Sequence, residues 1–591
     1  MAAWRTLRVL TRTGWLDASE LRIGLGCMRM STDESRDEEL ALETIAAAAE
    51  AGITVFDTAR AYGHGAAELG HNERLLARGL RRCRADATAR IVTKGGMTRA
   101  GDGWIPDGRA KAIRADCEAS LAALGGLPID LYLIHAPDPR TPWRTSVRAL
   151  ARLADEGVVK RVGLANVNLR QLDEALELAP ITAVQVALSP LDDSALRGGV
   201  VDRCTEAGIA MIAHSPLGGR RRASGLARQQ ALVDVADARG ATPAEVALAW
   251  LLELLPAVVA IPGARRPETA RSAAHAATVL IDAADRQALA SAFGKRRPAR
   301  VRRPRPADDA EVVVVMGIPG AGKSRVAEER VARGYLRLNR DARGGSLRAL
   351  ADALDEELSS GARRVVLDNT YLTRAARSYV IETASRHRVR TRCIWLDTPL
   401  AQAQVNVVER LLARFGSLPA PEELRELARH EPGVLAPTSQ MRTLRELEAP
   451  STDEGWTTVE QVPFTRTPSA RARSGVFVAA AALRQPEWER GLEEGDRAAP
   501  HLVFDWSADG SPGDLGKVAD LLATAISGPV ESALCPHGGG PPVCWCRPPL
   551  PGLPLAFARA HDVDPSRSVL VGTSPAHRTL ATTLGAHFVA V

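Results

Sequence analysis

The chain has 591 residues, of which 45% are hydrophobic and 25% are charged, and its formal net charge is +6. This composition is typical of globular proteins and excludes a disordered or collagen-like chain. No apolar run reaches the ~18 residues of a membrane span, and the N-terminal segment lacks the apolar core of a signal peptide. Eight cysteines are too few for a disulfide scaffold. We therefore expect a cytoplasmic protein with reduced thiols and no membrane partner.

Arginine is the general-purpose cation of this chain. Only six of the 76 basic residues are lysines, and they stand at positions 94, 111, 160, 295, 323 and 517. A lysine kept where arginine is otherwise used suggests a place that needs a compact ammonium. Lys94 and Lys323 lie inside two different catalytic motifs. The sequence therefore predicts two active sites on one chain.

Eight apolar runs within residues 1–294 alternate with stretches of helical period. The predicted strands are 21–27, 54–58, 91–94, 131–135, 162–165, 183–187, 210–214 and 258–261. Eight strand–helix units over ~270 residues favour a TIM (β/α)8 barrel, with a doubly wound sheet as the alternative.

Four chemically active residues lie where these predicted strands end. Asp57 and Tyr62 follow the second strand, Lys94 ends the third and His135 ends the fourth. Carbonyl reduction needs a hydride and a proton. The Lys94 ammonium would favour ionisation of the Tyr62 phenol, Asp57 would hold Lys94, and His135 would orient the substrate oxygen.

The motifs around these residues resemble a known family. D-T-A-R-A-Y, V-T-K-G and L-I-H-A-P-D, in this order, are similar to motifs of the aldo-keto reductase family, and the resemblance covers about residues 20–293. It implies a TIM barrel that reduces a small-molecule carbonyl substrate with NADPH. It also implies the cofactor-binding residues: Asn166 and Gln185 at the nicotinamide carboxamide, Ser215, Leu217 and Gly218 in a backbone cradle, and Arg265 and Arg266 at the 2′-phosphate. Many members bind the adenine with a Glu-Asn pair, where this chain has Arg271-Ser272-Ala273.

Residues 295–310 are rich in arginine and proline and have no hydrophobic period. This pattern predicts an extended, solvated linker. A basic arm that guides a polyanion is the alternative.

A phosphate-binding loop opens the second half of the chain. The apolar run 312–315 leads into G-I-P-G-A-G-K-S, followed by a helical pattern. In this context the backbone amides cradle phosphates, lysine reaches the β- and γ-oxygens, and serine ligates Mg²⁺. The predicted ATP and Mg²⁺ site consists of Gly317, Gly320, Gly322, Lys323 and Ser324, with Ser324 as the Mg²⁺ ligand.

The phosphate acceptor must be inferred from residues further downstream. N-R-D around Asp341, D-N-T after residue 367 and E-A-P-S-T-D-E-G-W resemble the kinase domain of polynucleotide 5′-kinase/3′-phosphatase proteins, over about residues 311–466. The resemblance implies that Asp341 takes the proton from a 5′-hydroxyl of RNA or DNA, that Arg340 positions this acceptor, and that Arg410 lies over the transferring phosphate. A kinase for a small sugar or polyol and a nucleotide-binding regulator without catalysis are the alternatives.

The last segment, residues 471–591, contains four closely spaced metal-binding side chains. Cys535, His537, Cys544 and Cys546 form a C-x-H-x₆-C-x-C array, which predicts a structural Zn²⁺ site. The surrounding sequence resembles zinc-containing phosphatases of the haloacid dehalogenase superfamily. The family's D-x-D-G-T nucleophile motif is not matched, because H-L-V-F-D-W-S-A-D-G-S has one residue too many between its acids. We therefore predict an inactive phosphatase-like α/β domain, which follows a barrel (1–294), a linker (295–310) and a P-loop α/β domain (311–470).

Overall fold

The computed structural model describes residues 15–100, 103–226, 228–255, 257–293, 310–465, 471, 473–540 and 542–591. The chain forms two compact units, residues 1–299 and 300–591. The predicted linker, apart from its last residue, lies outside the described residues. Within the described ranges, the structure contains no helix that is long and apolar enough to cross a membrane.

The first unit is a parallel eight-stranded barrel, and each strand falls within or overlaps a predicted one. Its strands, in sheet order, are β1 (Gly24–Gly26), β2 (Val55–Asp57), β3 (Arg90–Gly95), β6 (Leu131–Ile134), β7 (Val162–Ala165), β8 (Ile181–Ala187), β9 (Ala210–His214) and β10 (Val258–Ile261). The bridges Ile23–Ala260 and Gly26–Gly263 join the first strand to the last. Because these bridges bring the two edges together, the alternative of an open doubly wound sheet is excluded.

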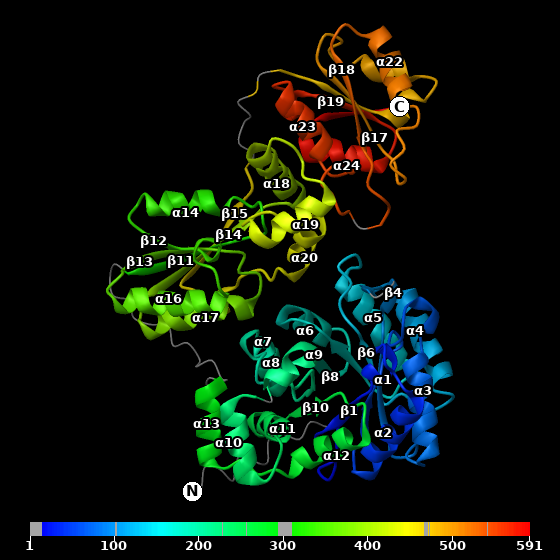
Figure 1. Cartoon of the computed structure of the whole chain (residues 1–591), viewed down its shortest axis with the longest axis vertical. Coiled ribbons are helices and arrows are strands. Elements are labelled where there is room, and N and C mark those ends of the chain that lie inside the picture. The colour runs from blue at the N-terminus through cyan, green and yellow to red at the C-terminus, as the bar shows by residue number, and fades with distance from the viewer. Residues whose placement is uncertain are drawn as a thin grey trace. The chain divides into compact units, whose positions relative to one another are not determined.

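Helices surround the barrel, as Figure 1 shows. They are α1 (Arg29–Thr32), α2 (Glu38–Glu50), α3 (His71–Arg82), α4 (Ala110–Ala123), α5 (Trp143–Asp155), α6 (Leu169–Leu176), α7 (Ser194–Arg197), α8 (Val200–Ala207), α9 (Gly219–Leu226), α10 (Gln230–Arg239), α11 (Pro243–Leu254), α12 (Pro267–His275) and α13 (Ala283–Phe293). Alternate side chains of the strands fill the interior, where Val55, Val92 and Leu133 are fully buried. A filled interior leaves the strand ends as the place for a site.

One barrel element was not predicted. Between β3 and α4 the chain forms an antiparallel hairpin, β4 (Met97–Ala100) and β5 (Gly103–Pro106). It follows the carboxyl end of β3, which is the strand that carries Lys94.

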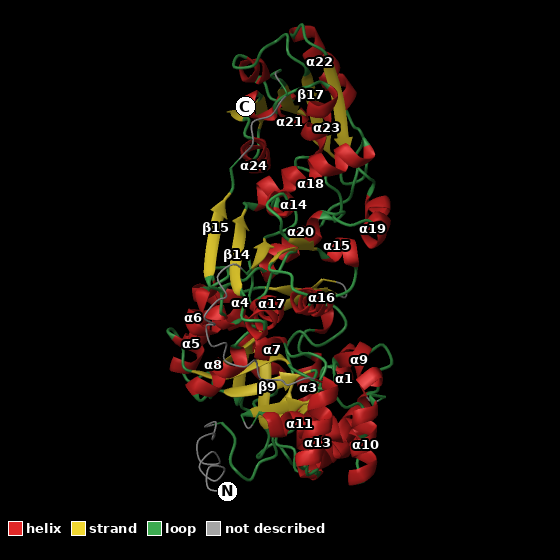
Figure 2. Ribbon diagram, turned by 90° about the vertical axis from the view of Figure 1, so that its left-hand side faces the viewer, coloured by secondary structure: helices red, strands yellow, loops and turns green. Residues whose placement is uncertain are grey.

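The second unit begins with a five-stranded parallel sheet. In sheet order its strands are β12 (Leu336–Leu338), β13 (Arg364–Asp368), β11 (Glu311–Met316), β14 (Arg390–Asp397) and β15 (Thr458–Pro463); Figure 2 shows β14 and β15 as neighbouring arrows that point the same way. Its helices are α14 (Lys323–Val331), α15 (Arg340–Arg343), α16 (Leu347–Ser359), α17 (Arg374–Arg386), α18 (Leu400–Phe415), α19 (Pro421–His430) and α20 (Pro437–Glu446). The valines of β11 alternate between two buried faces, one packed against α16 and α17 and the other against α14 and α18. Burial on both faces explains why β11 is a continuous apolar run.

A second five-stranded parallel sheet ends the chain. Its order is β18 (Val530–Cys535), β17 (His501–Trp506), β16 (Val476–Ala479), β19 (Val569–Gly572) and β20 (His587–Ala590). Its helices are α21 (Ala480–Leu483), α22 (Leu515–Ala525), α23 (Gly552–Ala560) and α24 (Pro575–Leu584). One face packs against α22, and the other packs against α23 and α24. This sheet, its helices and the cysteine array lie in the segment that we call the C-terminal domain (residues 471–591).

Candidate functional site

A buried lysine organises the carboxyl end of the barrel. Lys94 Nζ donates to both carboxylate oxygens of Asp57 at 2.7 Å and to the Thr58 carbonyl oxygen at 2.8 Å. It also lies 3.3 Å from Tyr62 Oη, and the Lys94 side chain is 1% exposed. Strands β2 and β3 are neighbours, so the ends of both deliver their side chains to this one point. The structure thus brings together Asp57, Tyr62 and Lys94.

Burial and charge act in opposite directions on the two proton-bearing groups. For Lys94, burial favours the neutral amine, but Asp57 and the Tyr62 oxygen together outweigh it and raise the pKa of the ammonium. For Tyr62, burial is the largest influence and raises the pKa of the phenol to about 12, although Lys94 opposes it. Lys94 therefore lowers the pKa of the Tyr62 phenol, as expected, but burial raises this pKa by more, so the net shift is upward.

The imidazole of His135 lies beside Tyr62. The two ring centroids are 5.7 Å apart and the rings are nearly perpendicular. Burial, followed by the positive charge of Lys94, lowers the pKa of His135 well below its usual value. His135 Nδ1 is buried without a hydrogen-bond partner among the described residues. The imidazole is therefore neutral at neutral pH and retains an unused polar atom.

The unpredicted hairpin adds an aromatic side chain to this group. The ring of Trp104, on β5, is 5.9 Å from that of Tyr62 and 6.0 Å from that of His135. The guanidinium of Arg99, on β4, lies 4.1 Å from the centroid of the Trp104 ring. Sequence reasoning missed both residues. The short apolar pair Trp104-Ile105 beside glycines was the only signal that this loop has structure.

Two predicted cofactor residues connect to this cluster. Gln185 Nε2 donates to Asp57 Oδ2 at 2.8 Å, and Asn166 Nδ2 donates to the His135 carbonyl oxygen at 3.0 Å. Asn166 Oδ1 lies 3.0 Å from His214 Nε2, a contact that sequence reasoning also missed. Asn166 has a φ of 57°, a left-handed conformation that asparagine tolerates better than most residues.

The other predicted cofactor residues lie along two loops. After β9, Ser215 and Gly218 both have positive φ, and the Gly218 amide donates to the Ser215 carbonyl oxygen at 2.8 Å, with half-buried Leu217 between them. After β10, Arg265 Nη1 lies 2.8 Å from Asp33 Oδ1, and Arg266 is exposed at the N-cap position of α12. Any anion that binds Arg265 must therefore compete with the Asp33 carboxylate.

The phosphate-binding loop follows β11 directly. Gly317, Gly320 and Gly322 have φ values of 152°, 86° and 94°, which other residues rarely adopt. A Cβ at Gly320 would also lie 2.3 Å from the Ala403 carbonyl oxygen, so this position has no room for a side chain. Lys323 begins α14, and its Nζ donates to the carbonyl oxygens of Gly317 and Ile318 at 3.0 Å each.

The acceptor side of the loop is built on β13. Asp368 ends this strand and is clamped by Arg337, with N–O distances of 2.9 and 2.6 Å. Asn339 Nδ2 donates to the Asp368 carbonyl oxygen at 2.8 Å, while its side-chain oxygen caps α15 by accepting from the Asp341 amide at 2.7 Å. This hydrogen bond fixes the backbone of Asp341, and its side chain is exposed.

A cavity of about 500 Å³ joins these groups. We call it the acceptor cavity, and its lining includes Lys323, Ser324, Asp341, Asp368 and Arg410. Arg410, on α18, donates to the Gly433 carbonyl oxygen at 2.6 Å, and burial lowers the pKa of its guanidinium. The structure therefore brings the predicted kinase residues to one cavity. Ser439 and Arg442 of α20 also line it, and sequence reasoning assigned them no role.

The four predicted metal ligands of the C-terminal domain converge. The ligand atoms of Cys535, His537, Cys544 and Cys546 all lie within 4.8 Å of one another. Cys535 Sγ is 3.6 Å from Cys544 Sγ and 3.3 Å from Cys546 Sγ. Sulfur ligands about 2.3 Å from a tetrahedral zinc lie about 3.7 Å apart, so the spacing fits one such ion.

The acids that were compared with the phosphatase motif do not lie on the central strand of the sheet. H-L-V-F-D lies on β17, whereas the central strand of the sheet is β16. The strand order reverses beside β16, and ligands of doubly wound sheets bind at such switch points. β16 ends in Ala479 and continues as Ala480, so it presents no carboxylate there. Asp505, on β17, is ion-paired with Arg484 at 3.0 Å.

Two protein families match separate parts of this chain. Residues 22–292 match the aldo/keto reductase family, and residues 312–431 match an AAA domain. An oxidoreductase of Schizosaccharomyces pombe is 32% identical over 250 residues, which cover 41% of this chain and 76% of that protein. A probable aldo-keto reductase of Glycine max is 31% identical over 274 residues, with coverages of 41% and 76%.

A solved structure is also similar to part of this chain. The crystal structure of a thermostable aldo-keto reductase in complex with epalrestat is 29% identical, covers 48% of this chain and 98% of its own, and has a TM-score of 0.41. The relatives that match the barrel are thus oxidoreductases, and the second unit begins with a P-loop-type domain. Through residues 22–292, this chain belongs to the aldo/keto reductase family.

Proposed function

We propose that this chain is a bifunctional enzyme, in which the barrel reduces a small-molecule aldehyde or ketone with NADPH and the P-loop domain phosphorylates 5′-hydroxyl ends of nucleic acid with ATP. The observation that carries the first half is the contact of Lys94 Nζ with both Asp57 and Tyr62 Oη. This contact places the Lys94 ammonium at a fixed position beside the Tyr62 phenol.

The residues at the mouth of the barrel fit a nicotinamide cofactor. Asn166 and Gln185 have amide groups beside the cluster, and Ser215 and Gly218 form a left-handed turn after β9. NADPH bound there would supply hydride to the carbonyl carbon. Arg265 and Arg266 would hold its 2′-phosphate. Arg265 would then give up its ion pair with Asp33 to bind the phosphate.

Residues of the chain itself then donate the proton and stabilise the charge that remains. Tyr62 Oη donates it to the carbonyl oxygen, so that hydride and proton together yield the alcohol. The Lys94 ammonium stabilises the phenolate that remains, and Asp57 holds that ammonium in place. Neutral His135 donates a hydrogen bond to the same oxygen and orients it, while Trp104 covers one side of the group.

The second activity is supported by the single cavity that contains Lys323 and Asp341. The glycine turn and the start of α14 fit a triphosphate, and Ser324 with Asp368 offers oxygen ligands of the kind that Mg²⁺ prefers. Asp341 would accept the proton of the attacking hydroxyl, and Arg410 would stabilise charge on the transferred group. Arg340 and Arg442, which line the same cavity, suit a phosphodiester chain.

A kinase for a small sugar or polyol is the second candidate, because the cavity alone does not require a polymer. A regulator that binds nucleotide without catalysis is the third. For the C-terminal domain we propose a structural Zn²⁺ held by Cys535, His537, Cys544 and Cys546, and no phosphatase activity. The alanines at the end of β16 support this assignment.

Tyr62→Phe tests the reductase. Without the phenolic proton, kcat for NADPH oxidation with an aldehyde panel should fall about 10²–10⁴-fold, while the Kd for NADPH stays unchanged. Tyr132→Phe is the matched control, because Tyr132 is also buried and its Oη donates to the Ile113 carbonyl oxygen. Activity that persists in Tyr62→Phe would refute Tyr62 as the acid.

Asp341→Asn tests the kinase. Transfer of phosphate from labelled ATP to 5′-hydroxyl oligonucleotides should fall about 10²–10⁴-fold with ATP binding retained. Asp352→Asn, on the exposed side of α16, should behave as wild type. Transfer to a small polyol with none to RNA or DNA would establish the second candidate instead, and full activity in Asp341→Asn would exclude this residue as the base.

The pH dependence of ATP binding tests Lys323. Burial, the largest influence, lowers the pKa of its ammonium to about 8 in the ligand-free protein. The charged form binds phosphate, so affinity should be constant below this pKa and should fall up to tenfold per pH unit as the pH rises above it. Arginine stays charged, so Lys323→Arg should remove this dependence between pH 8 and 9.5. A wild-type affinity that does not change over that range contradicts the assignment.

Metal analysis tests the cysteine array. Purified protein should contain one zinc per chain, and Cys544→Ser should lose it and lower the unfolding midpoint of the C-terminal domain. Cys83→Ser, a half-buried cysteine in the barrel, should keep the full zinc content. A wild-type chain without zinc after metal supplementation would show that the array is not a zinc site.

A further inference from the structure

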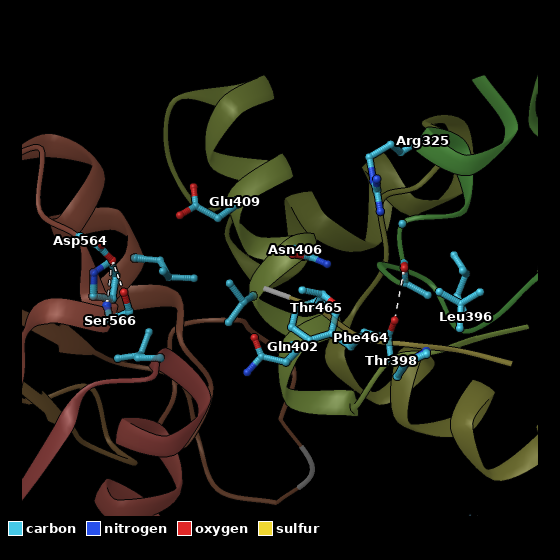
Figure 3. Close-up of a pocket in the computed structure, with 18 of the residues that line it drawn as sticks. Arg325, Leu396, Thr398, Gln402, Asn406, Glu409, Phe464, Thr465, Asp564 and Ser566 are labelled. Atoms are coloured by element: carbon cyan, nitrogen blue, oxygen red, sulfur yellow. Dashed lines mark hydrogen bonds between the residues drawn. The ribbon is translucent and has the colours of Figure 1, made fainter. Parts of the chain in front are cut away.

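A second cavity borders the phosphate-binding loop. It has a volume of about 670 Å³, and P-loop-domain residues line most of it. These include Arg325 of α14, Asn406 and Glu409 of α18, and Phe464 after β15. Residues of the C-terminal domain line the rest, with Leu555 and the Asp564–Ser566 turn among them. Figure 3 shows Asp564 and Ser566 on one side, Arg325 and Thr398 on the other, and α18 side chains between them.

The two cavities meet at the loop. Gly322, Arg325 and Asn406 line both, whereas Lys323, Asp341 and Arg410 line only the acceptor cavity. Phosphoryl transfer places the acceptor and the leaving diphosphate on opposite sides of the transferred group. With the acceptor beside Asp341, the nucleoside that ends the diphosphate must leave the loop on the other side. The 670 Å³ cavity borders the loop at Gly322 and Arg325 but is not lined by Asp341, so it offers space for that nucleoside.

The wall supplied by the C-terminal domain is fixed in place. The apolar side chains Val407, Leu411 and Leu412 of α18 are buried in one cluster with Phe557 and Leu580 of α23 and α24. This cluster is continuous with the core of the C-terminal domain, so the two parts share buried surface.

Polar contacts strengthen this interface at its edges. Gln402 Nε2 donates to the Thr583 carbonyl oxygen at 3.1 Å, and Trp545 Nε1 donates to the Leu435 carbonyl oxygen at 3.0 Å. Arg471 forms an ion pair with Glu409 at 3.1 Å on the rim of the cavity.

The turn that faces the cavity is itself well ordered. Asp564 Oδ1 accepts from the Ser566 amide at 2.9 Å and from Ser566 Oγ at 2.8 Å. The Asp564 carbonyl oxygen accepts from Ser568 Oγ at 2.7 Å. Ser566 itself is exposed, so its side chain can be enlarged into the cavity without disturbing the core.

We propose that the C-terminal domain forms one wall of the nucleoside-binding pocket of the P-loop site, through the Asp564–Ser566 turn. This inference rests on the proposed use of a nucleoside triphosphate. Phe464 offers an aromatic face for the base, and the turn closes the pocket opposite the phosphate-binding loop. A domain without a catalytic nucleophile thereby has a function in the neighbouring site.

Substitutions at residue 566 in the full-length chain test the proposal. Ser566→Leu and Ser566→Trp should fill the pocket in increasing measure, so the Kd for MgATP should rise, by at least tenfold for the tryptophan. The Kd for magnesium tripolyphosphate, which has no nucleoside, should stay within twofold of wild type in the same calorimetric titrations. Ala523→Trp, on the exposed face of α22 in the same domain, is the matched control and should change neither value.

Three outcomes can be told apart. Weakened ATP binding with unchanged tripolyphosphate binding supports the pocket wall. Unchanged ATP binding in both variants at residue 566 overturns it, while loss of both ligands in Lys323→Ala still supports the P-loop site. If the wild-type chain binds neither ligand, the proposed kinase function fails, and this inference fails with it.

Discussion

Two ammonium groups that lose contact with water, Lys94 fully and Lys323 in part, impose the strongest constraint on this chain. A charge that is taken out of water must gain compensating partners or lose its proton. Lys94 is compensated internally, because both oxygens of Asp57 lie 2.7 Å from its Nζ. Lys323 has only carbonyl oxygens in the described contacts of its Nζ, and its pKa falls to about 8. Lys94 is thus paired with a full negative charge, whereas the described hydrogen bonds of Lys323 Nζ reach only neutral carbonyl oxygens. These two arrangements suit proton transfer in one case and phosphate binding in the other.

Parallel sheets explain how distant residues reach each lysine. In both units the functional side chains follow the carboxyl ends of adjacent strands: Asp57 and Lys94 on β2 and β3, and the phosphate-binding loop and Asp368 on β11 and β13. Because neighbouring parallel strands end at the same edge, motifs far apart in sequence converge without any long-range signal of their own. This is why the barrel, its eight strands and the convergence of the motif residues could be predicted from the sequence.

The features that the sequence did not predict all depend on tertiary contacts. Trp104 lies beside Tyr62 because Met97–Ala100 and Gly103–Pro106 pair as antiparallel strands, and strands this short have too few alternating positions to be recognised in the sequence. H-L-V-F-D lies on β17, whereas β16 is the central strand of its sheet, and sequence periodicity does not encode this sheet order. The partner of Arg265 is Asp33, more than two hundred residues away, and no pattern couples them. Whether a strand forms depends on the local sequence, whereas sheet order and side-chain pairing depend on tertiary contacts.

The C-terminal domain combines a well-packed sheet with a central strand that ends without a carboxylate. The alanines after β16 offer no nucleophile at the switch point, while both faces of the sheet are covered by apolar side chains. Helices of this domain also pack on α18. Selection for stability alone does not require the polar turn at Asp564–Ser566 to face a cavity beside the phosphate-binding loop. A role for that turn in the neighbouring pocket accounts for both observations, since a wall must keep its shape but needs no nucleophile.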